Sequence, residues 1–320
     1  MARTRIDRDA PRRRQKEARL TWTRFHLSRE KQWPTWPEPY SKSYLGPLKS
    51  VEGYTKVWVG RKVEDPEQAA MIIYWQSQDA LKKFQDSPAC DEFLKGLPEN
   101  DVKVSLLSGA LLKDLSLNDA DSSKSPSAPP RLLSFQWETG FDFSKELHGR
   151  TTFTALAMSY TDVPNRKPLR DVVLGAFNGF FPSDCDDMRP RPVHNPNPRI
   201  RLGLYRERLP WMYSQTAWVW MDTGEDWVEA DPEQLEQQGT TVENGSGQMI
   251  FCQFRRWNGY NGATAEREEA SANNPEARES WAQVVGNTMP PVTAWEQERW
   301  DLEVVPEDEE GQEGKDDDTE

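Results

Sequence analysis

The chain has 320 residues, enough for two domains of roughly 100–150 residues each. Its formal net charge is −13, and although only 36% of its residues are hydrophobic, 14 Trp and 12 Phe supply large side chains for a core. Three widely spaced Cys, three His without metal-ligand spacing and no apolar run near the ~20 residues of a membrane helix argue against a disulfide framework, a metal site and a membrane span. We therefore expect a cytoplasmic protein with no metal and no membrane contact.

Charge is concentrated at the two ends of the chain. Residues 1–19 are rich in Arg, whereas residues 306–320 are almost entirely acidic or polar. Both segments are predicted to be solvated, disordered arms, and the alternative for the basic one is a nuclear-import signal or a phosphate contact. Because the part between them is acidic, nucleic acid is not expected as a partner.

The first predicted strand is Leu20–Leu27. Trp22, Arg24 and His26 alternate with Thr and apolar residues, so these three side chains share one face of the strand.

A strand–turn–strand–helix unit follows at Val57–Leu97. Ser77 is a predicted helix cap, and Ser87, which can cap in the same way, restarts the helix together with Pro88. The other predicted elements are an irregular loop at 31–40, a short helical turn within 44–50, a strand at 54–59, a polar turn at 60–66, a strand at 71–75 and a strand at 102–107. This β-α-β-β-α-β order is the ferredoxin-like arrangement.

The same unit resembles a known family, the antibiotic-biosynthesis-monooxygenase-like proteins of the dimeric α+β barrel superfamily, which are common in fungi. The matching residues are Trp58, Gly60, Arg61, Glu64, Asp65, Pro66, Trp75, Ser77, Ala80, Phe84, Ser87, Pro88 and Phe93. Many relatives carry a His after the helix Ala, where this chain has Leu81. The resemblance implies a barrel made of two four-stranded sheets and an enzyme of secondary metabolism that works without a cofactor.

The second half of the chain repeats this plan without shared identities. Its predicted elements are strands at 150–160, 218–221, 248–257 and 292–304, a helix at 168–181 and a helix at 263–285 that is broken at Pro275. Two irregular insertions, at 184–199 and 222–247, are either lids over a pocket or decoration.

These patterns predict an α+β fold in which two ferredoxin-like βαββαβ repeats form a fused, pseudo-dimeric barrel. A four-stranded sheet with helices on one face must bury its other face, and the second repeat can supply the cover. The expected parts are a basic arm at 1–19, the first repeat at 20–116, a Ser/Pro/Asp-rich linker at 117–131, the second repeat at 132–305 and an acidic tail at 306–320. A homodimer of such barrels is possible.

Local catalytic motifs are absent from the sequence, so the candidate site rests on strand faces. There is no GxSxG, no HExxH, no Gly-rich phosphate loop and no GxGxxG fingerprint. If the faces of the first three strands point into the barrel, they line an aromatic pocket with a few polar groups.

The candidate catalytic residues are His26 and Tyr74. A His has the reference pKa closest to neutral, which suits proton transfer. The alternatives are a surface or structural His26 and a core Tyr74 with its hydroxyl at the sheet edge.

The candidate substrate-binding residues are Trp22, Arg24, Trp58 and Arg61. Arg61 would orient an anionic or phenolic ligand; alternatively it is an exposed turn residue paired with Glu64 or Asp65.

Three functions from different classes fit these expectations. The first is a cofactor-independent tailoring enzyme (monooxygenase, decarboxylase or cyclase) that acts on an aromatic or polyketide-like molecule. The second is a non-catalytic module that binds an apolar small molecule, and the third is a structural or stress-associated barrel packed solid with Trp and Phe.

Overall fold

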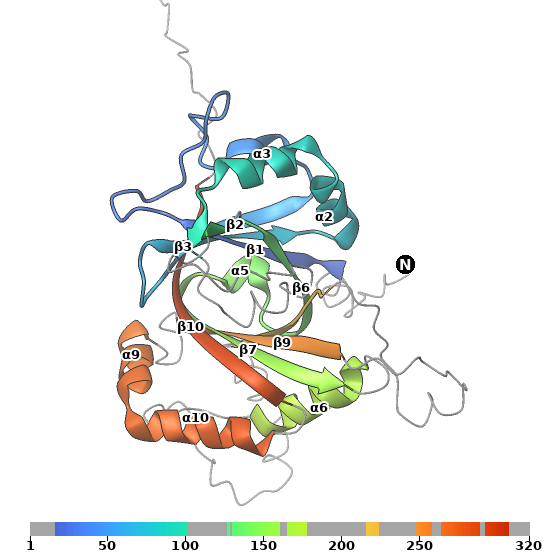
Figure 1. Ribbon diagram of the computed structural model, residues 1–320, viewed down its shortest axis with the longest axis vertical. Helices are drawn as coiled ribbons and strands as arrows, with labels where there is room; N and C mark the ends of the chain where they lie inside the picture. The colour runs from blue at the N-terminus through green and yellow to red at the C-terminus, as the bar shows by residue number, and fades with distance from the viewer. Residues whose placement is uncertain are drawn as a thin grey trace, which may run out of the picture.

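The computed structural model describes residues 17–101, 127–128, 130–160, 165–177, 216–223, 247–257, 264–288 and 292–306. Eight antiparallel strands form one closed barrel in the order β1-β3-β2-β10-β7-β9-β8-β6 (Figure 1). The strands are β1 (Arg19–His26), β2 (Tyr54–Lys62), β3 (Gln68–Trp75), β6 (Leu132–Gly140), β7 (Gly149–Tyr160), β8 (Thr216–Met221), β9 (Gly247–Trp257) and β10 (Val292–Val304). The short strands β4 (Asn100–Asp101) and β5 (Ser127–Ala128) pair apart from the barrel.

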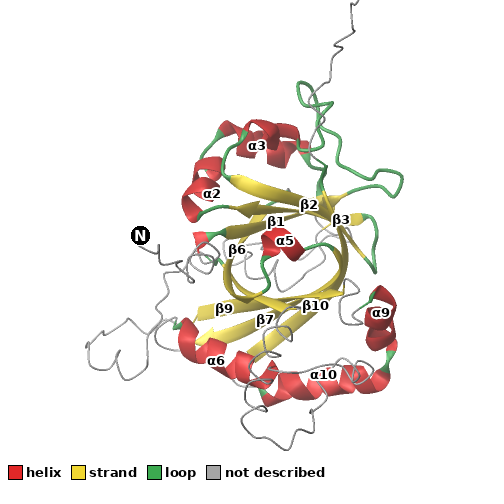
Figure 2. Cartoon of the chain, turned by 180° about the vertical axis from the view of Figure 1, so that it is seen from behind, coloured by secondary structure: helices red, strands yellow, loops and turns green. Residues whose placement is uncertain are grey.

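Helices lie outside the barrel on two opposite sides (Figure 2). One side holds η1 (Gly46–Ser50), α2 (Gln78–Gln85) and α3 (Pro88–Gly96). The other side holds α6 (Arg166–Phe177), α9 (Ala265–Asn273) and α10 (Pro275–Asn287). A further four-residue helix, α5 (Phe143–Glu146), lies between β6 and β7 at one end of the barrel.

The predicted cap at Ser77 is confirmed, whereas the Ser87 side chain makes no capping hydrogen bond. The Ser77 side chain accepts a hydrogen bond from the Ala80 backbone N–H at 3.1 Å, so α2 begins where its cap predicts. α3 begins at Pro88, and the predicted break at Pro275 separates α9 from α10. The predicted loop at 31–40 covers apolar surface, because the Trp36 ring stacks on Phe93 with centroids 5.4 Å apart.

The predicted polar turn at 60–66 is wrong at its start. Gly60 and Arg61 belong to β2, where they pair with Leu302 and Asp301 of β10. A strand from the far end of the chain thus extends β2 into residues whose local sequence favours a turn.

β6 is a strand that the sequence analysis missed. It pairs with β1 on one side and β8 on the other, and Leu133, Phe135 and Trp137 point into the barrel. At its end Gly140 has φ of 109°, and a Cβ there would collide with the Thr216 carbonyl, so only glycine fits. The strand predicted at 102–107 and most of the insertions at 184–199 and 222–247 lie outside the described residues.

The remaining elements of the second half are confirmed, with ends shifted by a few residues. β7, β8, β9 and β10 each contain the strand predicted for them. α6 (Arg166–Phe177) overlaps the predicted helix at 168–181 over residues 168–177, and residues 178–181 lie outside the described residues.

One strand order occurs twice around the barrel. β6-β1-β3-β2 and β10-β7-β9-β8 meet at two seams, β2 with β10 and β6 with β8. The residue pairs correspond too: Trp22 faces Ile72 and Leu133, just as Phe153 faces Phe254 and Glu298. We call residues related in this way matched positions. Those used below are Trp22 with Phe153, Arg24 with Ala155, Trp58 with Ala217, Lys62 with Met221, Leu133 with Glu298 and Trp75 with Trp257.

A buried Trp–Thr hydrogen bond occurs at matched positions in both halves. Trp75 Nε1 donates to Thr21 Oγ1 at 3.0 Å, and Trp257 Nε1 donates to Thr152 Oγ1 at 3.0 Å. Each Trp ends the strand that leads to a helix pair, so the bond fixes the same corner of each half.

Apolar side chains form three layers. The middle layer fills the barrel interior, and its aromatic members are Trp22, Trp58, Tyr74, Phe135, Trp137, Phe141, Phe143, Phe153, Phe254 and Trp300. The outer layers pack Phe84 and Phe93 of α2 and α3 on one side, and Val173 and Val285 of α6 and α10 on the other. Within the described ranges, no helix has both the length and the apolar character needed to cross a membrane.

Replacing Thr21 or Thr152 with Val removes the acceptor of a buried indole N–H and keeps the side-chain shape. We expect each change to lower the free energy of unfolding by about 1–3 kcal/mol, because the indole keeps its desolvation cost without a partner. Urea denaturation measures this loss. Thr55→Val, at an exposed strand position, is the control, and a loss as large as that of the buried pair would contradict the assignment.

Candidate functional site

Aromatic rings occupy the centre of the barrel. The Trp22 ring centroid lies 4.8 Å from that of Phe153, 5.7 Å from Phe254 and 5.1 Å from Trp300. Such tilted and edge-on contacts stabilise aromatic pairs beyond their buried area. The interior is therefore apolar and densely packed.

Four of the six predicted site residues face this interior. Trp22, Arg24, Trp58 and Tyr74 come from the inner faces of β1, β2 and β3. The predicted alternation of these strands is therefore confirmed at four positions.

The main polar group of the interior is the Glu298 carboxylate on β10, which accepts four hydrogen bonds. Arg24 donates from Nη1 to Oε1 at 3.1 Å and from Nη2 to Oε2 at 2.7 Å. Lys62 Nζ donates to Oε1 at 2.9 Å, and Trp300 Nε1 donates to Oε2 at 3.1 Å. The side chains of Glu298, Arg24 and Lys62 are 2%, 11% and 23% exposed, and we call these three residues the charged cluster.

The charged cluster fixes the protonation state of Glu298. Burial alone would raise the pKa of this carboxyl, but the positive charges of Arg24 and Lys62 outweigh burial and hold the pKa below its ordinary value. The Arg24 guanidinium carbon also lies 5.6 Å from the Trp22 ring centroid and 5.7 Å from that of Trp300, in cation–π range of both.

Tyr74 lies toward the end of the barrel where α5 sits. Its ring centroid is 6.4 Å from that of Phe143 on α5, and Lys56 Nζ donates to the Ser144 carbonyl at 3.2 Å nearby. Burial, with a smaller contribution from Asp142, raises the pKa of Tyr74 to about 12. At neutral pH the phenol is a hydrogen-bond donor and not a base.

Within the described part of the chain, the N–H groups of two interior indoles lack a hydrogen-bond acceptor. Trp22 Nε1 and Trp58 Nε1 are both buried, and neither has a hydrogen-bond partner among the described residues. Both residues pair with Ile72 on β3, one from each side, so their indoles share one inner surface. Arg24 Nε is likewise buried without an acceptor.

His26 is separate from this group. It follows Arg24 on the same face of β1 but is the last residue of the strand, and its side chain is exposed. It therefore lies at the end of the barrel and not among the interior rings.

Arg61 points away from the barrel interior. It donates from Nη1 to the carbonyls of Leu27 (2.8 Å) and Pro66, and from Nη2 to those of Ser28 (2.9 Å) and Lys31. Both terminal nitrogens are occupied by backbone acceptors, so Arg61 ties the loop after β1 to the β2–β3 turn. These carbonyl contacts are neither the ligand contact predicted for Arg61 nor the alternative pairing with Glu64 or Asp65.

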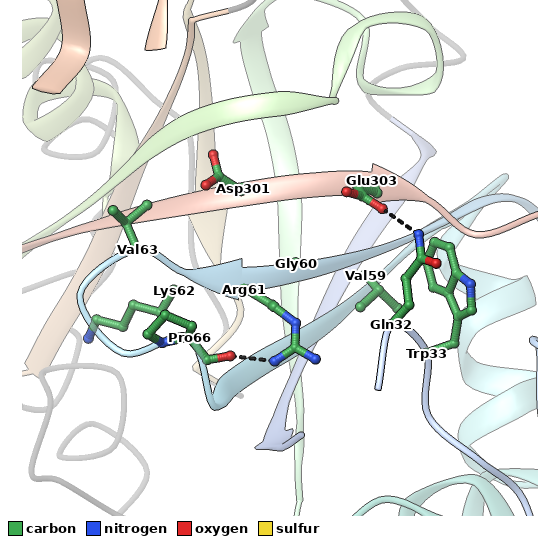
Figure 3. Close-up of a pocket in the computed structure, with 10 residues that line it drawn as sticks. All are labelled: Gln32, Trp33, Val59, Gly60, Arg61, Lys62, Val63, Pro66, Asp301 and Glu303. Atoms are coloured by element: carbon green, nitrogen blue, oxygen red, sulfur yellow. Dashed lines mark hydrogen bonds between the residues drawn. The ribbon is translucent and has the colours of Figure 1, made fainter. Parts of the chain in front are cut away.

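A surface groove of about 230 Å³ lies beside Arg61, on the outer side of the β2–β10 seam (Figure 3). Its lining residues are Gln32, Trp33, Val59, Gly60, Arg61, Lys62, Val63, Pro66, Asp301 and Glu303. Figure 3 shows Arg61 and Lys62 extending in different directions from adjacent places on β2. Gln32 Nε2 donates to Glu303 at 3.2 Å and closes one end of the groove.

Sequence reasoning missed Glu298 and Lys62. Both lie on strands that were predicted, and a carboxylate or an ammonium at an inward position of a barrel strand is a detectable signal. Their meeting also requires the β2–β10 pairing, which no local pattern reveals. No three His, Cys, Asp or Glu side chains in the described part of the chain are grouped so as to hold a metal ion.

Replacing Glu298 with Gln leaves Arg24 and Lys62 without a counter-charge. We expect the free energy of unfolding at pH 7 to fall by about 3 kcal/mol, as for other broken buried ion pairs. Because the folded-state pKa is depressed, this stabilisation is complete above the unfolded-state pKa and is lost as the pH falls through the folded-state value. The difference from wild type should therefore shrink on acidification below about pH 4.5, the ordinary pKa of a Glu side chain. Glu303→Gln, an exposed carboxylate on the same strand, is the control; a pH-independent gap between Glu298→Gln and wild type would refute the assignment.

Replacing Arg61 with Lys keeps the charge but loses the planar fork that reaches several carbonyls at once. We expect faster amide hydrogen exchange at Leu27, whose N–H donates to Glu67 at 2.8 Å, and at Lys31, whose N–H donates to Ser28 at 3.1 Å. Arg29→Lys, an exposed change in the same loop, should leave both rates unchanged. Unaltered hydrogen exchange in Arg61→Lys would show that the loop after β1 stays ordered without the Arg61 guanidinium.

Comparison with known proteins gives matches among solved structures. No family model matches the chain, and no curated protein matches it. The chain is similar to an anthrone oxidase-like protein (TM-score 0.41, 11% identity, 91% of this chain and 95% of that one). It is also similar to a "putative monooxygenase" from Lactobacillus acidophilus NCFM (TM-score 0.32, 9% identity, 90% of this chain and 96% of that one). Another "putative monooxygenase", from Fusobacterium nucleatum, is similar as well (TM-score 0.35, 8% identity, 92% of this chain and 95% of that one).

Proposed function

We propose that this protein binds an aromatic small molecule bearing oxygen atoms inside its barrel and acts on it as a monooxygenase-type enzyme without a bound cofactor. The reaction type is the one implied by the resemblance of Val57–Leu97 to the antibiotic-biosynthesis-monooxygenase-like proteins. The identity of the substrate within the aromatic or polyketide-like class stays open.

The observation that carries the proposal is the pair of buried indole N–H groups of Trp22 and Trp58. A buried donor without an acceptor lowers the stability of the folded state by about 1–3 kcal/mol. A ligand oxygen that accepted the hydrogen bond would remove this loss. The surrounding rings offer the edge-on and tilted contacts that an aromatic ligand would make. An oxygen-bearing aromatic molecule satisfies both requirements.

The predicted roles of His26 and Tyr74 continue as proposals. Tyr74, with a pKa of about 12, would donate a hydrogen bond to the ligand and stay protonated. His26, at the exposed end of β1, would exchange protons with solvent. Because side chains fill the interior, ligand entry requires the rings to move apart.

We also propose that the barrel consists of two fused ferredoxin-like repeats. The doubled strand order, the matched positions and the two Trp–Thr bonds support this origin. β6 pairs with β1 as the fourth strand of the first repeat. We therefore place the boundary between the two repeats in the segment from Gly140 to Gly149, and not in the predicted linker at 117–131. If Thr21→Val and Thr152→Val lowered the free energy of unfolding by unequal amounts, the two Trp–Thr hydrogen bonds would not be equivalent, and the repeat proposal would lose this support. Association of two such barrels stays a prediction.

A second candidate function is favoured by the density of the interior. A barrel filled with Trp and Phe also suits a protein that is not catalytic and whose two sheets merely cover each other. This candidate predicts that no aromatic molecule binds.

The test is an assay with an anthrone-type substrate, with oxygen consumption and product measured together and binding followed by tryptophan fluorescence. Trp22→Phe and Trp58→Phe keep the ring and remove the N–H, so each should weaken binding by about fivefold to tenfold, the value of one hydrogen bond. Trp295→Phe, at a 40% exposed position outside the site, is the matched control. Oxygen uptake no faster than the background, together with no fluorescence change, would favour the second candidate.

A further inference from the structure

We propose that the ligand of the barrel carries a carboxylate, and that Arg24 and Lys62 bind this group. The inference rests on the proposed function and names the chemical class of its substrate. It would make the charged cluster the part of the site that selects the ligand.

The charge of the cluster is not balanced. Arg24 and Lys62 carry two positive charges, while Glu298 supplies one negative charge, and all three side chains are largely removed from water. A buried excess of positive charge is costly unless an anion accompanies it. The surplus is one unit, which a single carboxylate would neutralise.

Hydrogen-bond donors also exceed acceptors at this place. Both terminal nitrogens of Arg24 are engaged with Glu298, whereas its Nε is buried without an acceptor. Lys62 has three N–H bonds, and its one partner among the described residues is Glu298. With the two indoles of Trp22 and Trp58, the inner surface offers several donors to a ligand with two oxygens.

Barrel closure does not require these charges. At the matched positions the other half has Ala155 for Arg24 and Met221 for Lys62, and Leu133 stands where Glu298 would be. The seam between β6 and β8 therefore closes around apolar side chains. The charges at the β2–β10 seam serve a purpose other than pairing the strands, and recognition of an anion fits them.

The matched positions also indicate which substitutions test the proposal. The triple variant Arg24→Ala, Lys62→Met, Glu298→Leu replaces each charge by the residue of the other half, and removing all members together leaves no unpaired buried ion. The ligand probes are 2-naphthoate and its neutral isostere 2-naphthamide, titrated into each protein by tryptophan fluorescence and calorimetry. We expect wild type to prefer the carboxylate by about tenfold, the effect of one charge-assisted hydrogen bond, and the triple variant to show no preference.

Two single variants keep the test decisive if the triple variant does not fold. Lys62→Met leaves the Arg24–Glu298 pair neutral overall and should lose most of the preference. Lys56→Met removes an inward-side lysine at the other end of β2, bonded to the Ser144 carbonyl, and should keep the preference.

The outcomes separate the two proposals. Equal or tighter binding of the amide by wild type overturns the carboxylate inference and leaves the proposed function standing. A preference that survives in Lys62→Met overturns the role of Lys62, and failure of both probes to bind overturns the proposed function and this inference together.

Discussion

The Glu298 carboxylate joins strands from both halves of the barrel. It stands on β10, and its partners Arg24 and Lys62 stand on β1 and β2, so one side chain bridges the seam between the halves. Because all three groups are mostly buried, each depends on the others for its solvation. The Trp22 and Trp300 rings lie around Arg24, and the three charges give the otherwise apolar interior its polar part.

The two halves agree on the outside and differ on the inside. Both end their third strand with a Trp bonded to a buried Thr, and both follow it with a helix pair whose second member starts with Pro. On the inner faces one half has Trp, Arg and Lys where the other has Phe, Ala and Met. The shared features are those that shape the fold, while the differing ones face the space where chemistry would occur.

Much of this architecture could be predicted from local sequence patterns. Alternation identified most strands, and the Ser77 cap and the helix break at Pro275 placed the helix boundaries, since these signals act within a few residues. β6 is not predicted, although Leu133, Phe135 and Trp137 alternate, because the strand expected at 102–107 takes the fourth place in the βαββαβ order. The charged cluster could not be predicted from local patterns, because it depends on pairing between strands more than two hundred residues apart. The backbone carbonyls that accept hydrogen bonds from Arg61 likewise have no sequence signature.

The sequence distance between β2 and β10 has a consequence for biosynthesis. β2 is translated more than two hundred residues before its barrel neighbour β10, and it lacks this partner until β10 has been made. Before β2 pairs with β10, the nascent polypeptide has an unpaired strand edge and an exposed apolar sheet face, and both features promote aggregation. Pairing with β10 then covers this edge of β2.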